Sequence, residues 1–186
     1  MSSGEAGIDI HIVQALPKSD KMELIIHKGT ELGVKEFTPL TLKRCVVNLD
    51  QKEAKKIARW QKIAEVAAKQ CGRDQIPKIN SVHSIKNIYE LLEKYDIVLL
   101  AYEEEKQYFL KEVIEELKQK TEKIHKIAMI IGPEGGIEPQ EVEELKQKGA
   151  KVISLGKRIL RTETVAFVIS SILMYEFGDI GGKEKT

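Results

Sequence analysis

The stretch "IIGPEGGIEPQEVEELKQKG", residues 130–149, decides the fold. Apolar residues lead into a turn that holds three glycines, a proline and Glu134, and an amphipathic segment follows almost at once. An apolar run of strand length that passes through such a turn into a helix is typical of a buried strand in an α/β protein. Pro139 suits the first turn of a helix and Gly149 its end. We therefore predict a strand over 126–131 and a helix from Pro139 to about Gly149.

The same alternation of apolar runs and amphipathic segments extends in both directions along the chain. Strand-like runs occupy 8–16, 34–40, 96–102, 126–131 and 151–155, and helical patterns occupy about 20–33, 50–72, 84–95, 105–121, 139–149 and 162–177. Most of the strands are apolar throughout, which is typical of strands covered on both faces. The sequence therefore predicts an α/β protein with a largely parallel sheet.

Two short patterns mark where helices begin. Asp20 with Glu23, and Asp50 with Glu53, have the spacing of a capping box, in which each side chain binds a free backbone N–H group of the first turn. Gly33 follows the first of these helices and indicates its end.

The last helix, 162–177, has almost no polar face. Its apolar residues include Phe167, Val168, Ile169, Ile172, Leu173, Met174, Tyr175 and Phe177. A helix that is apolar nearly all round must be covered on several sides. We expect either a subunit interface or a central core helix.

The composition limits the function classes. The chain has 186 residues, 42% of them hydrophobic, which is enough for one domain with a sizeable core. Its formal net charge of +1 creates no general attraction for nucleic acid, so any RNA contact needs local basic clusters. Cys45 and Cys71 form no CxxC pair, which favours a reduced, cytoplasmic protein.

The sequence predicts neither a metal site nor a membrane segment. The four histidines have no HxH or HExxH spacing. No apolar run reaches transmembrane length, and the N-terminus does not have the pattern of a signal peptide.

Three loops follow predicted strands and could form one site. They are "LAYEEE" at 100–105, "GPEGG" at 132–136 and "LGKRILRTET" at 155–164. Ligands of parallel α/β sheets bind beyond the carboxyl ends of the strands. If the three strands are neighbours, we expect the loops to converge on one pocket.

The GPEGG loop indicates the kind of ligand. It is neither a Walker A loop nor a GxGxxG motif. Glycines allow positive φ angles and let a ligand approach bare backbone, while Glu134 disfavours a phosphate. A neutral or cationic cofactor therefore fits better than a nucleoside triphosphate. The alternatives are a tight strand–helix turn without a ligand, or an α/β enzyme that binds ATP or NAD through this loop.

The "RILRTET" stretch carries candidate substrate-binding residues. Arg158 and Arg161 lie beside the predicted ligand loop, and arginine suits planar contacts with phosphate or a base edge. Thr162 or Thr164 could cap the last helix, and Glu163 in its first turn would be favourable to the helix dipole. The alternative is ordinary helix capping with both arginines solvated.

Together these segments resemble a known family. "GPEGGIEPQEVEELKQKGAKVISLGKRILRTETV", with "ALPKSDKMELIIHKGTELGV" and "RWQKIAEVAAKQCGR" upstream, is similar to the RsmE-like methyltransferases of the SPOUT superfamily. The resemblance covers about residues 8–178. It implies methylation of uridine N3 in 16S ribosomal RNA of the small subunit with S-adenosylmethionine as cofactor. It also implies a C-terminal deep trefoil knot, which general topology rules would not predict, and a homodimer with the site at its interface.

The resemblance also assigns residues and domains. The cofactor would lie among the three loops, at Leu100, Ala101, Tyr102, Gly132, Glu134, Gly136, Leu155, Gly156, Ile159 and Leu160. We expect a disordered N-terminal end at 1–7, the methyltransferase domain at 8–180 and a polar tail at 181–186. Full-length members of the family carry an N-terminal PUA-like RNA-binding domain, which we expect to be absent or truncated here.

Methyl transfer to uridine N3 requires alignment of the two reactants and loss of a proton. Candidate proton acceptors are Glu134 and Glu163, with Glu31 more remote, and Arg161 is the candidate for orienting the uridine. Alternatively, the three carboxylates serve only the loop, the helix dipole and the surface. Candidate RNA contacts are Lys18, Lys21, Lys28, Lys43, Arg44 and Arg73, each of which could simply be solvated. Two further functions stay open, a ribose 2′-O-methyltransferase and a non-catalytic RNA-binding dimer.

Overall fold

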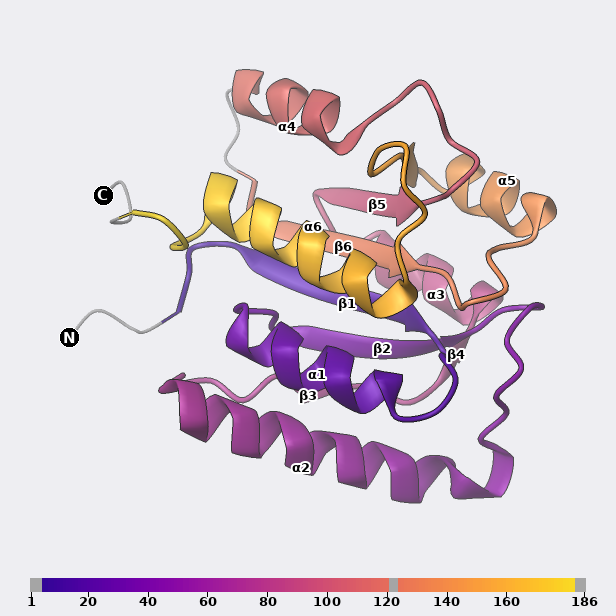
Figure 1. Cartoon of the computed structure of the whole chain (residues 1–186), viewed down its shortest axis with the longest axis vertical. Helices are drawn as coiled ribbons and strands as arrows, with labels where there is room; N and C mark the ends of the chain where they lie inside the picture. Colours follow the sequence, from indigo (N-terminus) through magenta and orange to yellow (C-terminus); the bar gives the residue numbers. More distant parts are fainter. Residues whose placement is uncertain (1–4, 121–123, 183–186) are drawn as a thin grey trace.

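The computed structural model describes residues 5–120 and 124–182, which form one parallel sheet covered by helices on both faces (Figure 1). The strands are β1 (Asp9–Ala15), β2 (Glu36–Thr41), β3 (Lys78–Ile79), β4 (His83–Ser84), β5 (Ile97–Ala101), β6 (Lys126–Ile131) and β7 (Lys151–Ile153). The helices are α1 (Lys21–Glu31), α2 (Glu53–Cys71), α3 (Ile85–Leu92), α4 (Leu110–Gln119), α5 (Pro139–Gln147) and α6 (Thr162–Phe177), with a 3₁₀ turn at Asp50–Lys52.

The sheet has the order β3-β2-β1-β6-β5-β7, with β4 beside β2. Each of these strand pairs is parallel. The predicted α/β class with a largely parallel sheet is therefore confirmed. Because β5 lies between β6 and β7, the loops that follow these three strands come to one edge of the sheet. The knot of the chain stays a prediction.

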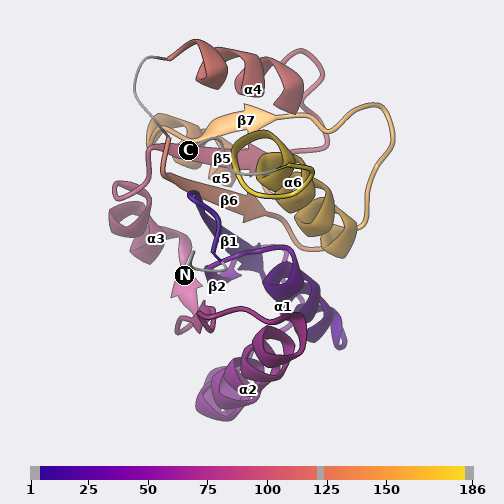
Figure 2. The same ribbon diagram turned by 90° about the vertical axis from the view of Figure 1, so that its left-hand side faces the viewer.

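Two apolar clusters lie on the two faces of the sheet. One is formed with α1, α2, α4 and α6, and the other with α3 and α5. Figure 2 shows α1 and α3 on opposite sides of the sheet. Along β1, Ile10 and Ile12 belong to the first cluster, and Val13 and Ala15 belong to the second. The central strands therefore bury both faces, as the period of two in side-chain direction requires.

β1 also buries two polar side chains, and both have partners. His11 binds Thr38 Oγ1 through Nε2 at 2.8 Å and the Tyr95 hydroxyl through Nδ1. Gln14 donates from Nε2 to Thr162 Oγ1 at 2.8 Å. Apolar and polar residues alternate along part of β1, yet the polar positions are as buried as the apolar ones. The polar residues are buried because β1 is central and each finds a hydrogen-bond partner.

Most helix boundaries follow the sequence, but both predicted capping boxes are wrong. α6 spans 162–177 and α5 begins at Pro139, as expected. Asp20 makes no side-chain cap, and Glu23 instead pairs with Arg59 at 2.8 Å. Glu53 accepts the backbone N–H of Val82. The carboxylates of Glu23 and Glu53, which the local pattern assigned to helix ends, instead bind partners that are distant in the sequence.

The helix expected at 105–121 begins only at Leu110. The Glu105 carboxylate accepts the backbone N–H groups of Gln107 and Tyr108 and holds this stretch as a loop. The loop after β5 is therefore longer than predicted.

The packed part of the chain begins earlier than predicted. Residues 1–4, part of the end that we expected to be disordered, lie outside the described residues, as do 183–186 of the polar tail. Glu5, however, forms an ion pair with Arg73 at 2.7 Å, and Ala6 is buried. Residues 5–7 therefore do not match the expectation of a disordered end, because this ion pair and apolar burial hold Glu5 and Ala6 against the domain.

Candidate functional site

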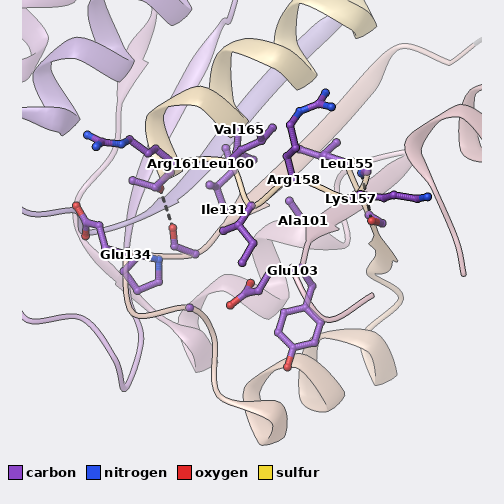
Figure 3. Close-up of a pocket in the computed structure, with 18 of the residues that line it drawn as sticks. Ala101, Glu103, Ile131, Glu134, Leu155, Lys157, Arg158, Leu160, Arg161 and Val165 are labelled. Atoms are coloured by element: carbon purple, nitrogen blue, oxygen red, sulfur yellow. Dashed lines mark hydrogen bonds between the residues drawn. The ribbon is translucent and has the colours of Figure 1, made fainter. Parts of the chain in front are cut away.

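A cavity of about 430 Å³ lies at the carboxyl ends of β5, β6 and β7 (Figure 3). The lining comes from the three predicted loops and from the first turns of α1 and α6. It consists of Lys21, Ala101, Tyr102, Glu103, Ile131, Gly132, Pro133, Glu134, Gly136, Ser154, Leu155, Gly156, Lys157, Arg158, Ile159, Leu160, Arg161, Thr162 and Val165. The three loops thus converge on one pocket, as the order of the strands predicted.

Nine of the ten residues that the resemblance assigned to the cofactor line this cavity. The exception is Leu100, whose side chain is fully buried in the cluster on the α3 and α5 face. Neighbouring residues of β5 point to opposite faces and Ala101 takes the position at the cavity, so contact of Leu100 with the cofactor stays a prediction. Glu103 lies in the predicted loop 100–105 and lines the cavity, although the resemblance assigned it no role.

The GPEGG loop is a tight turn that brings backbone to the cavity. The Gly136 N–H donates to the Pro133 carbonyl at 2.9 Å, and Gly136 has a φ of 72°. A Cβ at Gly132 would lie 2.7 Å from Ile137 Cγ1, and one at Gly136 would collide with the Glu103 carboxylate. A larger residue at Gly132 would crowd Ile137, and one at Gly136 would strain the backbone at this positive φ.

A buried hydrogen-bond chain joins β1 to two of the cavity loops. Gln14 Nε2 donates to Thr162 Oγ1, and the Thr162 hydroxyl donates to the Gly132 carbonyl, each at 2.8 Å. Gln14 Oε1 has no partner among the described residues. This series of hydrogen bonds fixes the start of α6 relative to the glycine loop. The sequence predicted neither the role of Gln14 nor this role of Thr162.

An ion-paired cluster closes the side of the cavity next to α1. Lys21 Nζ lies 2.9 Å from Glu134 Oε1 and 3.5 Å from Glu163 Oε2. Glu134 also accepts the backbone N–H of Lys18 at 3.1 Å. Burial acts to raise the pKa of Glu134, but the hydrogen bonds from Lys21 and from backbone N–H groups outweigh it and hold the pKa below its usual value. Two of the predicted proton acceptors are therefore held by one lysine.

Three cations surround the cavity without partners. The side chains of Lys157, Arg158 and Arg161 make no hydrogen bond or ion pair with described residues. In Figure 3, Arg161 extends on one side of the cavity and Arg158 and Lys157 on the other. Between them, Ile159 is 85% exposed. The cations are free to bind an anionic ligand.

The predicted RNA contacts differ in availability. The guanidinium of Arg73 is only 7% exposed and is bound by Glu5 and by the carbonyls of Thr30 and Val34, so it stabilises the end of α1 and cannot contact RNA. The others are partnered at the surface: Lys28 with Glu31, Lys43 with Gln140, Arg44 with Glu138, and Lys21 with Glu134 and Glu163. The Lys18 side chain is exposed without a partner in the described chain. Glu31, which Lys28 and His27 hold, does not line the cavity.

α6 packs on the sheet with one face and leaves apolar side chains on another. Ala166, Ile169, Leu173 and Met174 are buried. Val168 and Ile172 are only partly covered, and Tyr175 is 64% exposed. The helix is thus neither fully buried nor polar on its outer face.

No helix among the described residues is both long and apolar enough to span a bilayer. Within 5–120 and 124–182, no three side chains of His, Cys, Asp or Glu come close enough together to hold a metal ion.

A family model described as an RNA methyltransferase domain matches residues 4–174, nearly the whole chain. The chain belongs to this RNA methyltransferase family. Its relatives include the ribosomal RNA small subunit methyltransferases E, and the RsmE-like resemblance is thereby confirmed.

Two such relatives show the extent of the similarity. The enzyme of Bacillus subtilis is 39% identical over 173 residues, which are 92% of this chain and 68% of the relative. The enzyme of Buchnera aphidicola (subsp. Schizaphis graminum) is 34% identical over 183 residues, 95% of this chain and 69% of the relative. The chain thus spans about two thirds of the length of these family members.

Two solved structures are similar in fold. A putative methyltransferase from Legionella pneumophila, in complex with bound S-adenosylmethionine, has a TM-score of 0.84 at 33% identity, over 96% of this chain and 70% of that one. A ribosomal RNA small subunit methyltransferase E from Neisseria gonorrhoeae, also bound to S-adenosyl methionine, has a TM-score of 0.80 at 28% identity with the same coverage.

Proposed function

We propose that this protein methylates uridine N3 in 16S ribosomal RNA with S-adenosylmethionine as the methyl donor. The observation that carries the proposal is the cavity at the ends of β5, β6 and β7, which is lined by glycine-containing loops in a member of this family. Solved relatives that share the fold bind the same cofactor.

The residues of the cavity fit this cofactor. The turn at 132–136 has glycines at three of its five positions, so it presents backbone groups to the cavity with few side chains in the way. Ala101, Leu155 and Leu160 supply apolar surface, and Glu103 supplies a carboxylate without an ion pair in the described chain. The glycine turn, this apolar surface and the Glu103 carboxylate match a cation with an apolar body, while the unpaired Arg158 and Arg161 are left for the anionic RNA. Bound S-adenosylmethionine supplies an electrophilic methyl group on a sulfonium.

The chain's own residues align the acceptor and remove its proton. Arg161, at the start of α6, is free to orient the uridine or a neighbouring phosphate, and alignment is worth roughly 7–11 kcal/mol of a two-reactant barrier. When N3 gains the methyl group, its proton must leave to a base. Lys21 holds Glu134 and Glu163, whereas Glu103 is exposed at the cavity. Glu103 is therefore the carboxylate that is free to take the proton.

The proposal includes a homodimer in the cytoplasm. The partly covered apolar side chains of α6 and the exposed Ile159 supply apolar surface that a second copy would cover. Burial of such surface contributes about 25 cal/mol per Å². Both the site at the dimer interface and the deep trefoil knot follow from the resemblance.

The test is calorimetric titration of the purified chain with S-adenosylmethionine, with ATP as control and with the oligomeric mass measured in parallel. Saturable binding of S-adenosylmethionine alone, by a dimer, is the expected result. Binding of ATP alone would instead indicate a nucleotide-binding enzyme. An intact dimer that binds RNA and no cofactor would indicate the non-catalytic alternative.

The position of the methyl group needs a second measurement. Ribosomal RNA from small subunits would be methylated by the protein and digested to nucleosides, and the mass increase located by fragmentation. A methyl group on uracil is expected. A methyl group on the ribose would contradict the base specificity and leave the methyltransferase class intact.

A further inference from the structure

The outer face of α2 carries a line of cations. Lys55, Arg59, Lys62, Val66 and Lys69 are exposed and recur every three or four residues, so they lie on one side of the helix. Four of these five are basic, and Val66, which is 58% exposed, is the one apolar member. We call this line of residues the α2 stripe.

Residues 52–71, which contain the α2 stripe, carry much of the positive charge of the chain. Residues 52–71 contain six Lys and Arg residues and two Glu residues, a net charge of +4, while the other 24 cations and 27 carboxylates give −3. The near-zero net charge of the chain therefore hides a strongly basic helix.

Few carboxylates neutralise this helix. Glu65 pairs with Lys62, and Glu23 of α1 pairs with Arg59, each at 2.8 Å. The side chains of Lys52, Lys55, Lys56 and Lys69 have no hydrogen bond or ion pair in the described part of the chain. These four charges are therefore available to a partner.

The α2 stripe begins on the same side of the molecule as the proposed site, with α1 between the two. α1 and α2 lie side by side (Figure 1), and the Arg59–Glu23 ion pair joins them. α1 begins with Lys21, which lines the cavity. The first turn of α2 lies on the side of the molecule toward which the strands point (Figure 1), and the cavity lies at the carboxyl ends of β5, β6 and β7 on that side. A polymer bound at the cavity can therefore continue across the start of α1 onto α2.

We propose that the α2 stripe binds backbone phosphates of the RNA that flanks the methylated uridine. This inference rests on the proposed function. From Lys55 to Lys69 the stripe is about 21 Å long at 1.5 Å per residue, which is long enough to meet several phosphates. Lysines on a solvated helix give sequence-independent phosphate contacts and position the substrate. One exposed valine provides too little apolar surface for a protein interface, which favours a polyanion.

The test removes three charges from the α2 stripe and compares the salt dependence of RNA binding. The variant is Lys55→Gln with Lys62→Gln and Lys69→Gln. The matched control is Lys86→Gln with Lys94→Gln and Lys111→Gln, three exposed lysines outside α2. Fluorescence anisotropy would follow the binding of a labelled 16S ribosomal RNA fragment across a series of salt concentrations.

Each lost phosphate contact should reduce the slope of log affinity against log salt by about 0.7–0.9. We therefore expect the stripe variant to have a slope shallower by roughly 2 and an affinity at low salt lower by about 10-fold or more, while the control matches the wild type. A third variant with Lys→Arg at 55, 62 and 69 keeps the charges and should also match the wild type.

Equal slopes in the stripe variant and the control would overturn the proposal. Equal losses in the Gln and Arg variants would also overturn it, because the effect would then come from helix structure. Calorimetry with S-adenosylmethionine distinguishes failure of this inference from failure of the proposed function. Suppose that the wild type binds the cofactor and methylates RNA, and that the slope of log affinity against log salt is the same in every variant. Only the inference about the α2 stripe then fails. If the wild type binds no cofactor and transfers no methyl group, the proposed function fails.

Discussion

Gln14 and Thr162 are 148 residues apart in the chain and are joined by a buried hydrogen bond of 2.8 Å beside the cavity that Thr162 lines. The Thr162 hydroxyl in turn donates a hydrogen bond to the Gly132 carbonyl. One buried amide on the central strand thus sets the position of the first turn of α6 and of the glycine loop at once.

We predict that Gln14→Leu and Thr162→Val each lower the free energy of unfolding by about 1–3 kcal/mol, since each leaves a buried polar group without its partner. Both variants should also bind S-adenosylmethionine more weakly, because the two loops lose their common support. Because Gln14 and Thr162 belong to one series of hydrogen bonds, the double variant should lose less free energy of unfolding than the two single losses added together. Urea unfolding and calorimetry measure both effects. Thr162→Ser, which keeps the hydroxyl, is the control, and fully additive losses would contradict the coupling.

We predict different effects from neutralising the two carboxylates at the cavity. Glu134→Gln should reduce the rate of methyl transfer by less than about 10-fold, because this carboxylate is bound by Lys21 and its pKa is held low. Glu103→Gln should reduce the rate by about 10²–10⁴-fold if it removes the proton acceptor. Single-turnover rates at saturating cofactor measure this. A Glu103→Gln variant with a normal rate and weaker cofactor binding would show instead that Glu103 contacts the cofactor.

The sequence predicted the backbone of the site better than its side chains. The apolar runs and the glycine turn identified β5, β6 and the three convergent loops, because strand burial and turn geometry are local properties of the chain. Arg73 and Glu23 were assigned wrongly because their partners, Glu5 and Arg59, are 68 and 36 residues away. Ion pairs over such separations depend on packing that no local pattern encodes.

Gly136 gives a test of the cavity that does not depend on RNA. Its φ of 72° is a conformation that side chains rarely adopt, and a Cβ there would displace the Glu103 carboxylate at the cavity. Gly136→Val, alone or with Gly135→Val, should abolish binding of S-adenosylmethionine and leave the oligomeric mass unchanged. Gly72→Ala is the matched control, because this glycine also has a positive φ, of 76°, but has no atom near its Cβ position and lies at the end of α2. Unchanged cofactor affinity in the Gly136 variant would place the cofactor elsewhere.

Arg161 and Arg158 form a matched pair at the cavity, since both line it and neither has a partner in the described residues. We predict that Arg161→Ala keeps cofactor binding and lowers kcat/KM for RNA by roughly 10²-fold, the scale of loss from a misplaced reactant. Arg158→Ala should have a smaller effect, because Arg158 lies on the other side of the cavity (Figure 3). Initial-rate kinetics with labelled S-adenosylmethionine measure both. Full activity of Arg161→Ala would remove Arg161 from the mechanism.

His11 makes the stability of the fold sensitive to acid. Burial lowers the pKa of this imidazole to about 4 from its ordinary value of 6.5, despite the opposing effect of Glu36 at 4.0 Å. Below about pH 6.5 the unfolded chain takes up a proton that the folded chain excludes, so the contribution of His11 is present above that pH and is lost as the pH falls toward 4. The difference corresponds to about 3 kcal/mol at most. His11→Gln retains an amide for Thr38 and Tyr95 but does not titrate. Urea midpoints measured across this range should fall more steeply with acid in the wild type than in His11→Gln, and parallel curves would show that another group controls the loss.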